Sequence, residues 1–389
     1  MKTITPVIQN SLLSVERWVE EHNYKSYEPF DGLSSVLRPL TFNNIFAERI
    51  LQQLVRQSPL NLRPVLGVSP QESTKGRGYM AWGYLKRYQY TKDELYLKKA
   101  DACFDWLLMN CSPGYSKPSW GNHFDFTSRA GRLPKKEPII VWTSLIGQAF
   151  LDAYELTGNK KYLDTASKIC SWILDLPREK TQKGTCLSYV MFTQSSIHNS
   201  NMLGAAMLAR AGKKLSDSNM VSVAKEAMEY SCSRQLPNGA WYYGEGPQTR
   251  WIDNFHTGYN LDSLKCFVEV TGDHDYDAVM KKGFDFFKNS FFEESGRPKY
   301  YHNRVYPVDI QCASQAIDTF ACFSSYDSQS IDLGIKVAKW TIENMQDRRG
   351  FFYFRQLPFI RAKTPMLHWG QATMYKALAN LLLAINKKK

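Results

Sequence analysis

The phrase from Trp251 to Tyr259 holds the densest set of side chains suited to acid–base chemistry. Asp253 stands directly before a segment with helical spacing, and His256 follows it after three residues. Exposed amides at a helix N-terminus attract carboxylates and hydroxyls, so a ligand that carries such groups suits this position. The alternative interpretation of Asp253 is an ordinary N-cap. Because histidine exchanges protons near neutral pH, we expect Asp253, His256 and Tyr259 to form a catalytic centre.

Two charged residues precede this phrase and add further candidates. Glu245 lies shortly after Trp241 and two tyrosines, and apolar surroundings would raise the pKa of its carboxyl group to suit a general acid. The alternative for Glu245 is a solvated carboxylate at the tip of a loop. Arg250 offers a planar fork for an anionic group. Together with Trp251, Arg250 is expected to contact substrate.

Polar and aromatic residues recur just before several other predicted helices. Asp309 is a further catalytic carboxylate candidate in this pattern. The expected substrate-binding residues are Trp120, Asp125, His198, Asn199, Gln311, Arg355, His368 and Trp369. Each of these residues taken alone is typical of a helix cap, and their recurrence at equivalent places is what favours a shared site.

A weak internal repeat indicates which elements position these residues. The segments 149–158 and 266–272 share an apolar helix that ends in Thr-Gly, and the two threonines stand 114 positions apart, or about twice 57. Apolar residues at three-and-four spacing predict paired helices. The predicted pairs are 77–90 with 93–109, 143–156 with 160–175, 199–212 with 218–234, 255–270 with 275–291, and 309–324 with 329–345. A helix over 369–385 follows them, and helices over 7–21 and 42–57 are expected to close the ring.

Six such hairpins predict an all-α (α/α)6 toroid that forms a single domain over residues 1–389. Residues 1–75 would supply the closing helices and residues 76–385 the repeated hairpins. An open solenoid is the alternative, but its ends would need polar caps. Turns within hairpins are short, whereas the loops between hairpins are long and carry strand-like runs. Those long loops would emerge at one end of the toroid, where we expect the site to lie.

Composition and charge limit the classes of binding partner. Hydrophobic residues make up 43% and charged residues 22%, which predicts a large core, and the net charge of +12 favours an anionic partner. No nucleic-acid signature appears, so an acidic polysaccharide is the preferred anion. Metal-ligand spacing and phosphate-binding motifs are also missing, so no metal or other cofactor is expected. The first ten residues lack an apolar run, which predicts no signal peptide, no membrane span and a cytoplasmic location.

Several phrases resemble a toroid family whose members are commonly labelled polysaccharide-biosynthesis proteins of bacteria and archaea. The resemblance runs in order over about 75–385, and Trp-Ile-Asp-Asn-Phe-His at 251–256 is its most specific part. More remotely, the layout is similar to six-hairpin glycosidases and to the helical domain of glucuronyl C5-epimerases. The phrases that carry the resemblance are 120–126, 139–155, 198–199, 251–259 and 306–310.

This resemblance implies a carbohydrate-active protein that makes or modifies a surface polysaccharide, with an oligosaccharide or polysaccharide as its partner. Hydrolysis of an acidic glycan would use two carboxyl groups, chosen from Glu245, Asp253 and Asp309. A uronic-acid C5-epimerase or lyase would instead abstract a ring proton with His256 or Tyr259, while an arginine neutralises the sugar carboxylate. The third alternative is a non-catalytic protein that binds a glycan or a lipid-linked intermediate. The oligomeric state is left open.

Overall fold

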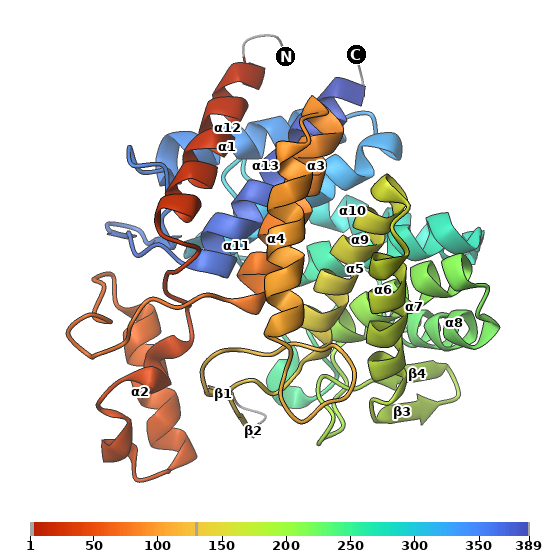
Figure 1. The fold of residues 1–389 in the computed structure, drawn as a ribbon, viewed down its shortest axis with the longest axis horizontal. Coiled ribbons are helices and arrows are strands. Elements are labelled where there is room, and N and C mark those ends of the chain that lie inside the picture. The colour runs from red at the N-terminus through yellow and green to blue at the C-terminus, as the bar shows by residue number, and fades with distance from the viewer. Residues whose placement is uncertain (1–3, 129–130, 388–389) are drawn as a thin grey trace.

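Inner and outer helices form two concentric layers in the computed structural model, which describes residues 4–128 and 131–387 (Figure 1). Each inner helix packs against the next, and the last one returns to the first, so the ring is closed. The inner helices are α3 (Thr74–Thr91), α5 (Ile140–Thr157), α7 (His198–Leu215), α9 (Asn254–Thr271), α11 (Ile310–Cys322) and α13 (Thr373–Lys387). The outer helices are α4 (Leu95–Met109), α6 (Lys160–Leu174), α8 (Ser218–Cys232), α10 (Asp277–Ser290), α12 (Ser330–Met345) and α1 (Ile4–Glu21). The predicted (α/α)6 toroid is confirmed.

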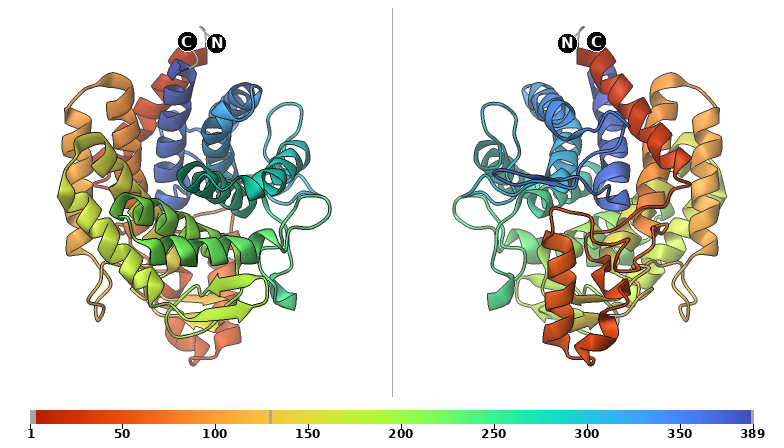
Figure 2. Two further views of the ribbon diagram at one scale, coloured as in Figure 1. Left: turned by 90° about the vertical axis from the view of Figure 1, so that its right-hand side faces the viewer. Right: turned by 90° about the vertical axis from the view of Figure 1, so that its left-hand side faces the viewer.

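Of the two N-terminal helices, one belongs to the ring and the other lies outside it. Helix α1 packs against α12 and α13, and so supplies the outer helix beside the last inner one, as expected for 7–21. Helix α2 (Ile45–Gln57) forms where 42–57 was predicted, but its main contacts are η1 (Asp31–Ser34), η2 (Arg38–Thr41) and strand β1. The expectation that this second helix closes the ring was therefore wrong. It projects from the long-loop end of the toroid (Figures 1 and 2).

The repeated Thr-Gly phrase marks the turn within a hairpin. Thr157 and Thr271 each donate their hydroxyl to the carbonyl four residues back, at 2.7 Å. The following Gly158 and Gly272 have φ values of 70° and 71°, the left-handed conformation that ends a helix and that glycine adopts without steric cost. This local chemistry explains both the internal repeat and the shortness of these turns.

The strands all lie in the connections that lead from an outer helix to the next inner one, so they gather at one end of the toroid, as predicted. Two of the sheets are antiparallel hairpins, and the third has the order β5–β6–β7. The strands are β1 (Phe126–Ser128), β2 (Gly131–Leu133), β3 (Arg178–Thr181), β4 (Gly184–Leu187), β5 (Val308–Asp309), β6 (Arg355–Gln356) and β7 (Arg361–Ala362). Two short helical turns, η3 (Pro247–Thr249) and η6 (Leu367–Ala372), also lie in these connections. Two others, η4 (His274–Tyr276) and η5 (Phe323–Ser325), lie instead in the turns within hairpins.

Much of the aromatic content lies in the core between the two helix layers. Trp120 and Trp241 are fully buried, and their indole N–H groups donate to the carbonyls of Leu107 and Ser231, both at 2.9 Å. Each tryptophan thus buries its ring and satisfies its polar atom in the same place. Within the described ranges, no helix has the length and apolar character needed to cross a bilayer.

Candidate functional site

Asp253 organises the predicted cluster at the start of α9. It caps the helix by accepting from the amide of His256 at 3.0 Å, and its other oxygen accepts from the His256 Nδ1 and Trp251 Nε1 atoms, both at 2.7 Å. The Asp253 side chain is buried, whereas that of His256 is 18% exposed. The structure therefore brings together three residues that the sequence singled out, as a carboxylate–histidine dyad beside a tryptophan.

Glu245 joins a second predicted residue, His198. The His198 Nε2 and Glu245 Oε1 atoms lie 2.7 Å apart, with His198 buried and the Glu245 side chain 37% exposed. The hydrogen bond from His198 lowers the pKa of Glu245, and the charge of Arg250 contributes in the same direction. The expectation of a raised pKa was therefore wrong, because the neighbouring groups of Glu245 are cations and hydrogen-bond donors rather than apolar rings.

Asp309, Arg355 and Trp369 form a third, fully buried cluster. Asp309 caps α11 through the amide of Gln311 at 2.9 Å. Its carboxylate accepts from Arg355 Nε at 2.5 Å and from Trp369 Nε1 at 2.7 Å. The structure again joins residues that were predicted separately, but their buried contacts link β5, β6 and η6 to one another and so indicate a structural role.

The remaining predicted residues lie apart from one another. Trp120 belongs to the core, and Asp125 forms an ion pair with Arg38 on the outside of the loop end. Asn199 is buried, and its side-chain oxygen has no hydrogen-bond partner within the described residues. His368 Nδ1 lies 2.5 Å from Glu28 Oε2, and both groups are buried. Sequence reasoning missed Glu28, because it stands in a connection without helical or strand periodicity.

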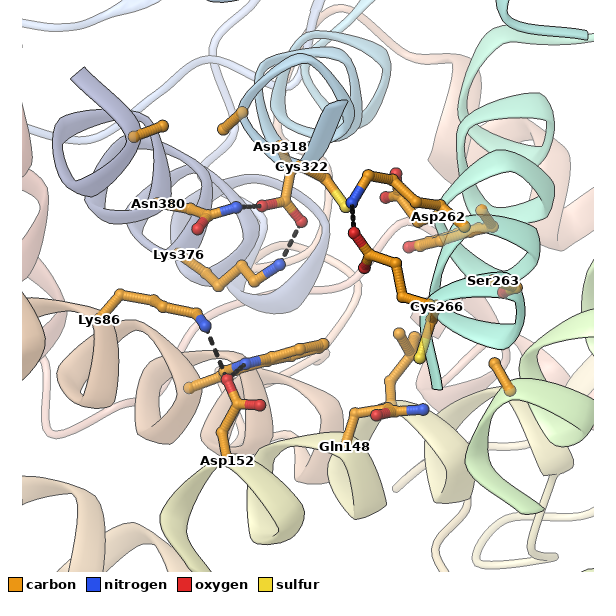
Figure 3. Close-up of a pocket in the computed structure, with 18 of the residues that line it drawn as sticks. Lys86, Gln148, Asp152, Asp262, Ser263, Cys266, Asp318, Cys322, Lys376 and Asn380 are labelled. Atoms are coloured by element: carbon orange, nitrogen blue, oxygen red, sulfur yellow. Dashed lines mark hydrogen bonds and ion pairs between the residues drawn. The ribbon is translucent and has the colours of Figure 1, made fainter. Parts of the chain in front are cut away.

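A cavity of about 540 Å³ lies inside the ring of inner helices, and all six of these helices line it (Figure 3). Tyr79 and Tyr259 form its inner end, whereas Glu155, Ser325 and Lys387 line it at the C-terminal ends of the inner helices. The cavity therefore opens at the short-turn end, opposite the long loops. Of the predicted site residues, Tyr259 alone is part of its described lining.

The inner end of the cavity is polar. Tyr259 Oη lies 3.0 Å from Tyr79 Oη and accepts from Gln311 Nε2 at 2.9 Å. The Lys75 ammonium group approaches the same oxygen at 3.4 Å, and burial lowers the pKa of Lys75 to about 7. Two predicted residues, Tyr259 and Gln311, are thus in direct contact, and they separate the cavity from the loop end.

Two aspartates on the cavity wall are held in place by basic side chains (Figure 3). Asp318 accepts from Asn380 Nδ2 at 2.8 Å and forms an ion pair with Lys376. Asp152 accepts from Lys86 Nζ at 2.7 Å and from Arg210 Nη2 at 2.6 Å. Burial alone would raise the pKa of Asp152, but these two cations hold it well below its usual value.

An aromatic ring joins the two networks. Trp82 Nε1 donates to Asp152 at 2.7 Å, and the Lys376 ammonium group lies 4.0 Å from the centre of the Trp82 ring. The ring thus carries a cation on its face and a carboxylate at its edge, as its quadrupole favours. The polar wall is therefore continuous from α11 through α13 and α3 to α5.

Asp262 on α9 differs from the other two aspartates. One carboxyl oxygen accepts from Gln315 Nε2 at 2.7 Å and from Thr319 Oγ1 at 3.1 Å, while Oδ1 is buried without a hydrogen-bond partner among the described residues. Burial, and then the negative charge of Asp318, raise the pKa of Asp262 to about 8. Asp262 is therefore protonated at neutral pH. Two carboxyl groups in one cavity, one paired with a lysine and the other without a cation partner among the described residues, are the arrangement expected of an acid and its partner base.

The raised pKa of Asp262 has a measurable effect on stability. The folded state holds the proton up to about pH 8, whereas the unfolded carboxyl group has a pKa of 3.8. The contribution of Asp262 to the free energy of unfolding therefore falls as the pH rises from about 4 to about 8. Thermal melts of wild type and Asp262→Asn should show the wild type losing melting temperature relative to the variant over this window. A constant difference would contradict the raised pKa.

The positions of Asp262 and Asp318 follow the internal repeat, which is a signal present in the sequence. Asp262 stands nine positions after the N-cap Asp253, and Asp318 stands nine positions after the N-cap Asp309. Each lies among apolar residues in a helix that is buried on nearly every side. A carboxyl group in such a place requires a partner or a function. No group of three metal-binding side chains is arranged around an ion site in the described residues.

The six-hairpin architecture is shared with solved structures of sugar-processing enzymes. A glycoside hydrolase family 76 mannosidase from Bacteroides thetaiotaomicron is similar with a TM-score of 0.62 and 14% identity, covering 82% of this chain and 88% of that one. Cellobiose 2-epimerase from Bacillus thermoamylovorans is similar with a TM-score of 0.60 and 11% identity, covering 82% and 88%. The sequence matches no protein-family model and no curated protein. At this identity the likeness shows the fold alone, an (α/α)6 toroid.

Proposed function

We propose that this protein is a carbohydrate-active enzyme that hydrolyses a glycosidic bond of an acidic glycan in the ring cavity. The observation that carries the proposal is that Asp262 and Asp318 line one polar cavity, where burial and the charge of Asp318 raise the pKa of Asp262 to about 8. Glycoside hydrolysis needs one carboxylic acid and one carboxylate at the scissile bond. Structural likeness to mannosidases supports this choice among reactions that use two carboxyl groups.

Each side chain then has a distinct task. Asp262 donates its proton to the glycosidic oxygen, so the leaving sugar departs as an alcohol. Asp318, which is oriented by Lys376 and Asn380, stabilises the positive charge that develops on the other sugar ring, and acts as the nucleophile or as the base that activates water. Water supplies the hydroxyl group of the second product. Trp82 and Tyr79 offer ring faces and edges to the sugar.

The cavity also favours an anionic substrate. Its lining contains five basic residues, and with Asp262 protonated only four carboxylates oppose them in the described lining. The net charge of +12 acts in the same direction over a longer range. An acidic polysaccharide or its precursor is therefore the proposed substrate, in line with the resemblance to polysaccharide-biosynthesis proteins.

The proposal is tested by incubating the protein with uronic-acid and neutral oligosaccharides of matched length and measuring the reducing ends that appear. We expect cleavage of the uronic-acid series, and loss of cleavage in Asp318→Asn. Cleavage of the neutral series alone would contradict the acidic substrate. Binding of either series without cleavage would support the non-catalytic alternative.

The loop end supports a second candidate function, epimerisation or lysis of a uronic acid. The supporting observation is the Asp253–His256 dyad, in which a buried carboxylate orients a partly exposed imidazole that could abstract a ring proton.

An epimerase would exchange the C5 proton with solvent, so uronic-acid oligosaccharides in D2O should gain one deuterium with wild type and none with His256→Ala. If the ring cavity is the active site, we expect neither wild type nor His256→Ala to incorporate deuterium. Deuterium incorporation by wild type would instead place the active site at the loop end.

A further inference from the structure

The segment between residues 36 and 65 exposes an unusual amount of apolar surface. Phe42 is 86% exposed and Val65 79% exposed, and on α2 the side chains of Phe46, Ile50 and Leu54 form a stripe with a spacing of four residues. We call this set the α2 apolar face. It consists of Val36, Leu37, Leu40, Phe42, Ile45, Phe46, Ile50, Leu54, Leu60 and Val65.

Helix α2 is inverted relative to an ordinary surface helix. Its polar Glu48 and Gln52 are fully buried, while Phe46, Ile50 and Leu54 point outward. Val55 is the large apolar side chain of α2 that is buried with them. Gln52 exchanges hydrogen bonds with the backbone of Thr127, both at 3.1 Å, and Glu48 accepts from the Thr127 hydroxyl at 3.1 Å. The polar side of α2 is thus fixed to β1. Because scattered apolar residues are common but a clustered set of this size marks an interface, the α2 apolar face requires a partner.

Charge identifies the kind of partner. Of the four arginines in residues 34–67, Arg63 is buried against Asp31, Arg38 pairs with Asp125 and Arg56 packs over the Phe30 ring. The positive charge beside the face therefore comes from Arg49 and from cations of neighbouring segments, and the single acidic residue of 34–67, Glu48, is buried. At one edge of the face, Arg132 donates to the carbonyl of Asn43 at 3.1 Å, directly beside Phe42. At the other edge, Leu60 lines a groove of about 500 Å³ together with Arg361 and Lys363, and the described lining of this groove holds no aspartate or glutamate.

We propose that the α2 apolar face docks on an anionic membrane surface. Apolar side chains would enter the interfacial region of the bilayer, while the flanking cations contact lipid phosphates. A second copy of this chain is less suited to cover the face, because two basic rims would repel each other. This mode of binding needs no membrane-spanning helix.

The geometry has a consequence for substrate access. Helix α2 projects from the long-loop end of the toroid (Figure 2). The residues that line the ring cavity place its opening at the short-turn end. Docking through α2 would therefore leave the cavity mouth facing away from the lipid surface. This orientation suits a protein that acts on a polymer held near a membrane, although the docking itself does not depend on the proposed hydrolysis.

Flotation of the full chain with lipid vesicles tests the proposal. We expect binding to vesicles that contain phosphatidylglycerol, weak binding to pure phosphatidylcholine, and release by high salt. Phe46→Ser combined with Leu54→Ser should lower the bound fraction by about tenfold or more, because two large apolar anchors are lost. Both side chains are exposed, so the fold should persist, as circular dichroism would show.

A matched control is Leu95→Ser, which removes a 50% exposed leucine at the start of α4, at the other end of the toroid, and should bind vesicles like wild type. Arg361→Glu with Lys363→Glu should reduce binding to anionic vesicles only. Absence of binding by folded wild type would overturn the proposal. So would a dimer in light scattering that the Phe46→Ser and Leu54→Ser variant dissociates, since the face would then belong to a second copy.

Discussion

Asp262→Asn is expected to lower kcat on an acidic oligosaccharide by about 100-fold to 10,000-fold, the usual loss on removing a general acid. Asparagine keeps the size of the side chain and can still accept from Gln315 and Thr319, but it has no acidic proton to transfer to the leaving oxygen. KM should change much less than kcat, because the groups that contact the sugar are unchanged. Initial rates of reducing-end formation over a range of substrate concentrations measure both constants.

Glu245→Gln is the matched control for this experiment. Glu245 is also a predicted catalytic carboxylate, but it lies at the loop end, away from the ring cavity. Its replacement should leave kcat within about twofold of wild type, as expected of a group that takes no part in the transition state. A larger loss in Glu245→Gln than in Asp262→Asn would contradict the assignment of the cavity and favour the loop end.

Asp309→Ala is expected to lower the free energy of unfolding by about 3–5 kcal/mol, the cost of leaving a buried charge without its partner. The substitution would leave the Arg355 guanidinium group buried and unpaired, remove the acceptor of the Trp369 indole, and delete the N-cap of α11. Urea unfolding followed by circular dichroism measures the loss.

A double variant separates the structural role of Asp309 from the predicted catalytic one. Asp309→Leu with Arg355→Met removes both charges together, so it should recover much of the stability that Asp309→Ala loses. Activity should return with the fold. A stable, well-folded Asp309→Ala protein without activity would show instead that the carboxylate acts in catalysis.

The fold was predictable because its signals are local and repeated. The Thr-Gly turn after α5 and α9 has a hydrogen bond and a left-handed glycine that recur with the hairpin period. The place of α2 was not predictable in the same way. Its apolar stripe resembles that of a ring helix, and only the contacts of Glu48 and Gln52 with β1 show that the polar side faces inward.

The candidate site was predicted in part. The caps Asp253 and Asp309 do gather His256, Trp251, Arg355 and Trp369, because each carboxylate satisfies an exposed amide at its helix start and can still accept from these side chains. Local sequence cannot show, however, that the Asp309 cluster is buried and therefore has a structural role. Nor does it show that Asp262 and Asp318 share a cavity, since that depends on how neighbouring inner helices face one another. Their catalytic role, like that of the loop-end residues, stays a prediction.

The most direct test is a crystal structure of Asp262→Asn with a bound uronic-acid oligosaccharide. We expect sugar density inside the ring of inner helices, with the glycosidic oxygen within hydrogen-bonding distance of residue 262 and Asp318 close to the anomeric carbon. Oligosaccharide bound instead around Glu245 and His256 at the loop end, with the ring cavity unoccupied, would contradict the proposed function.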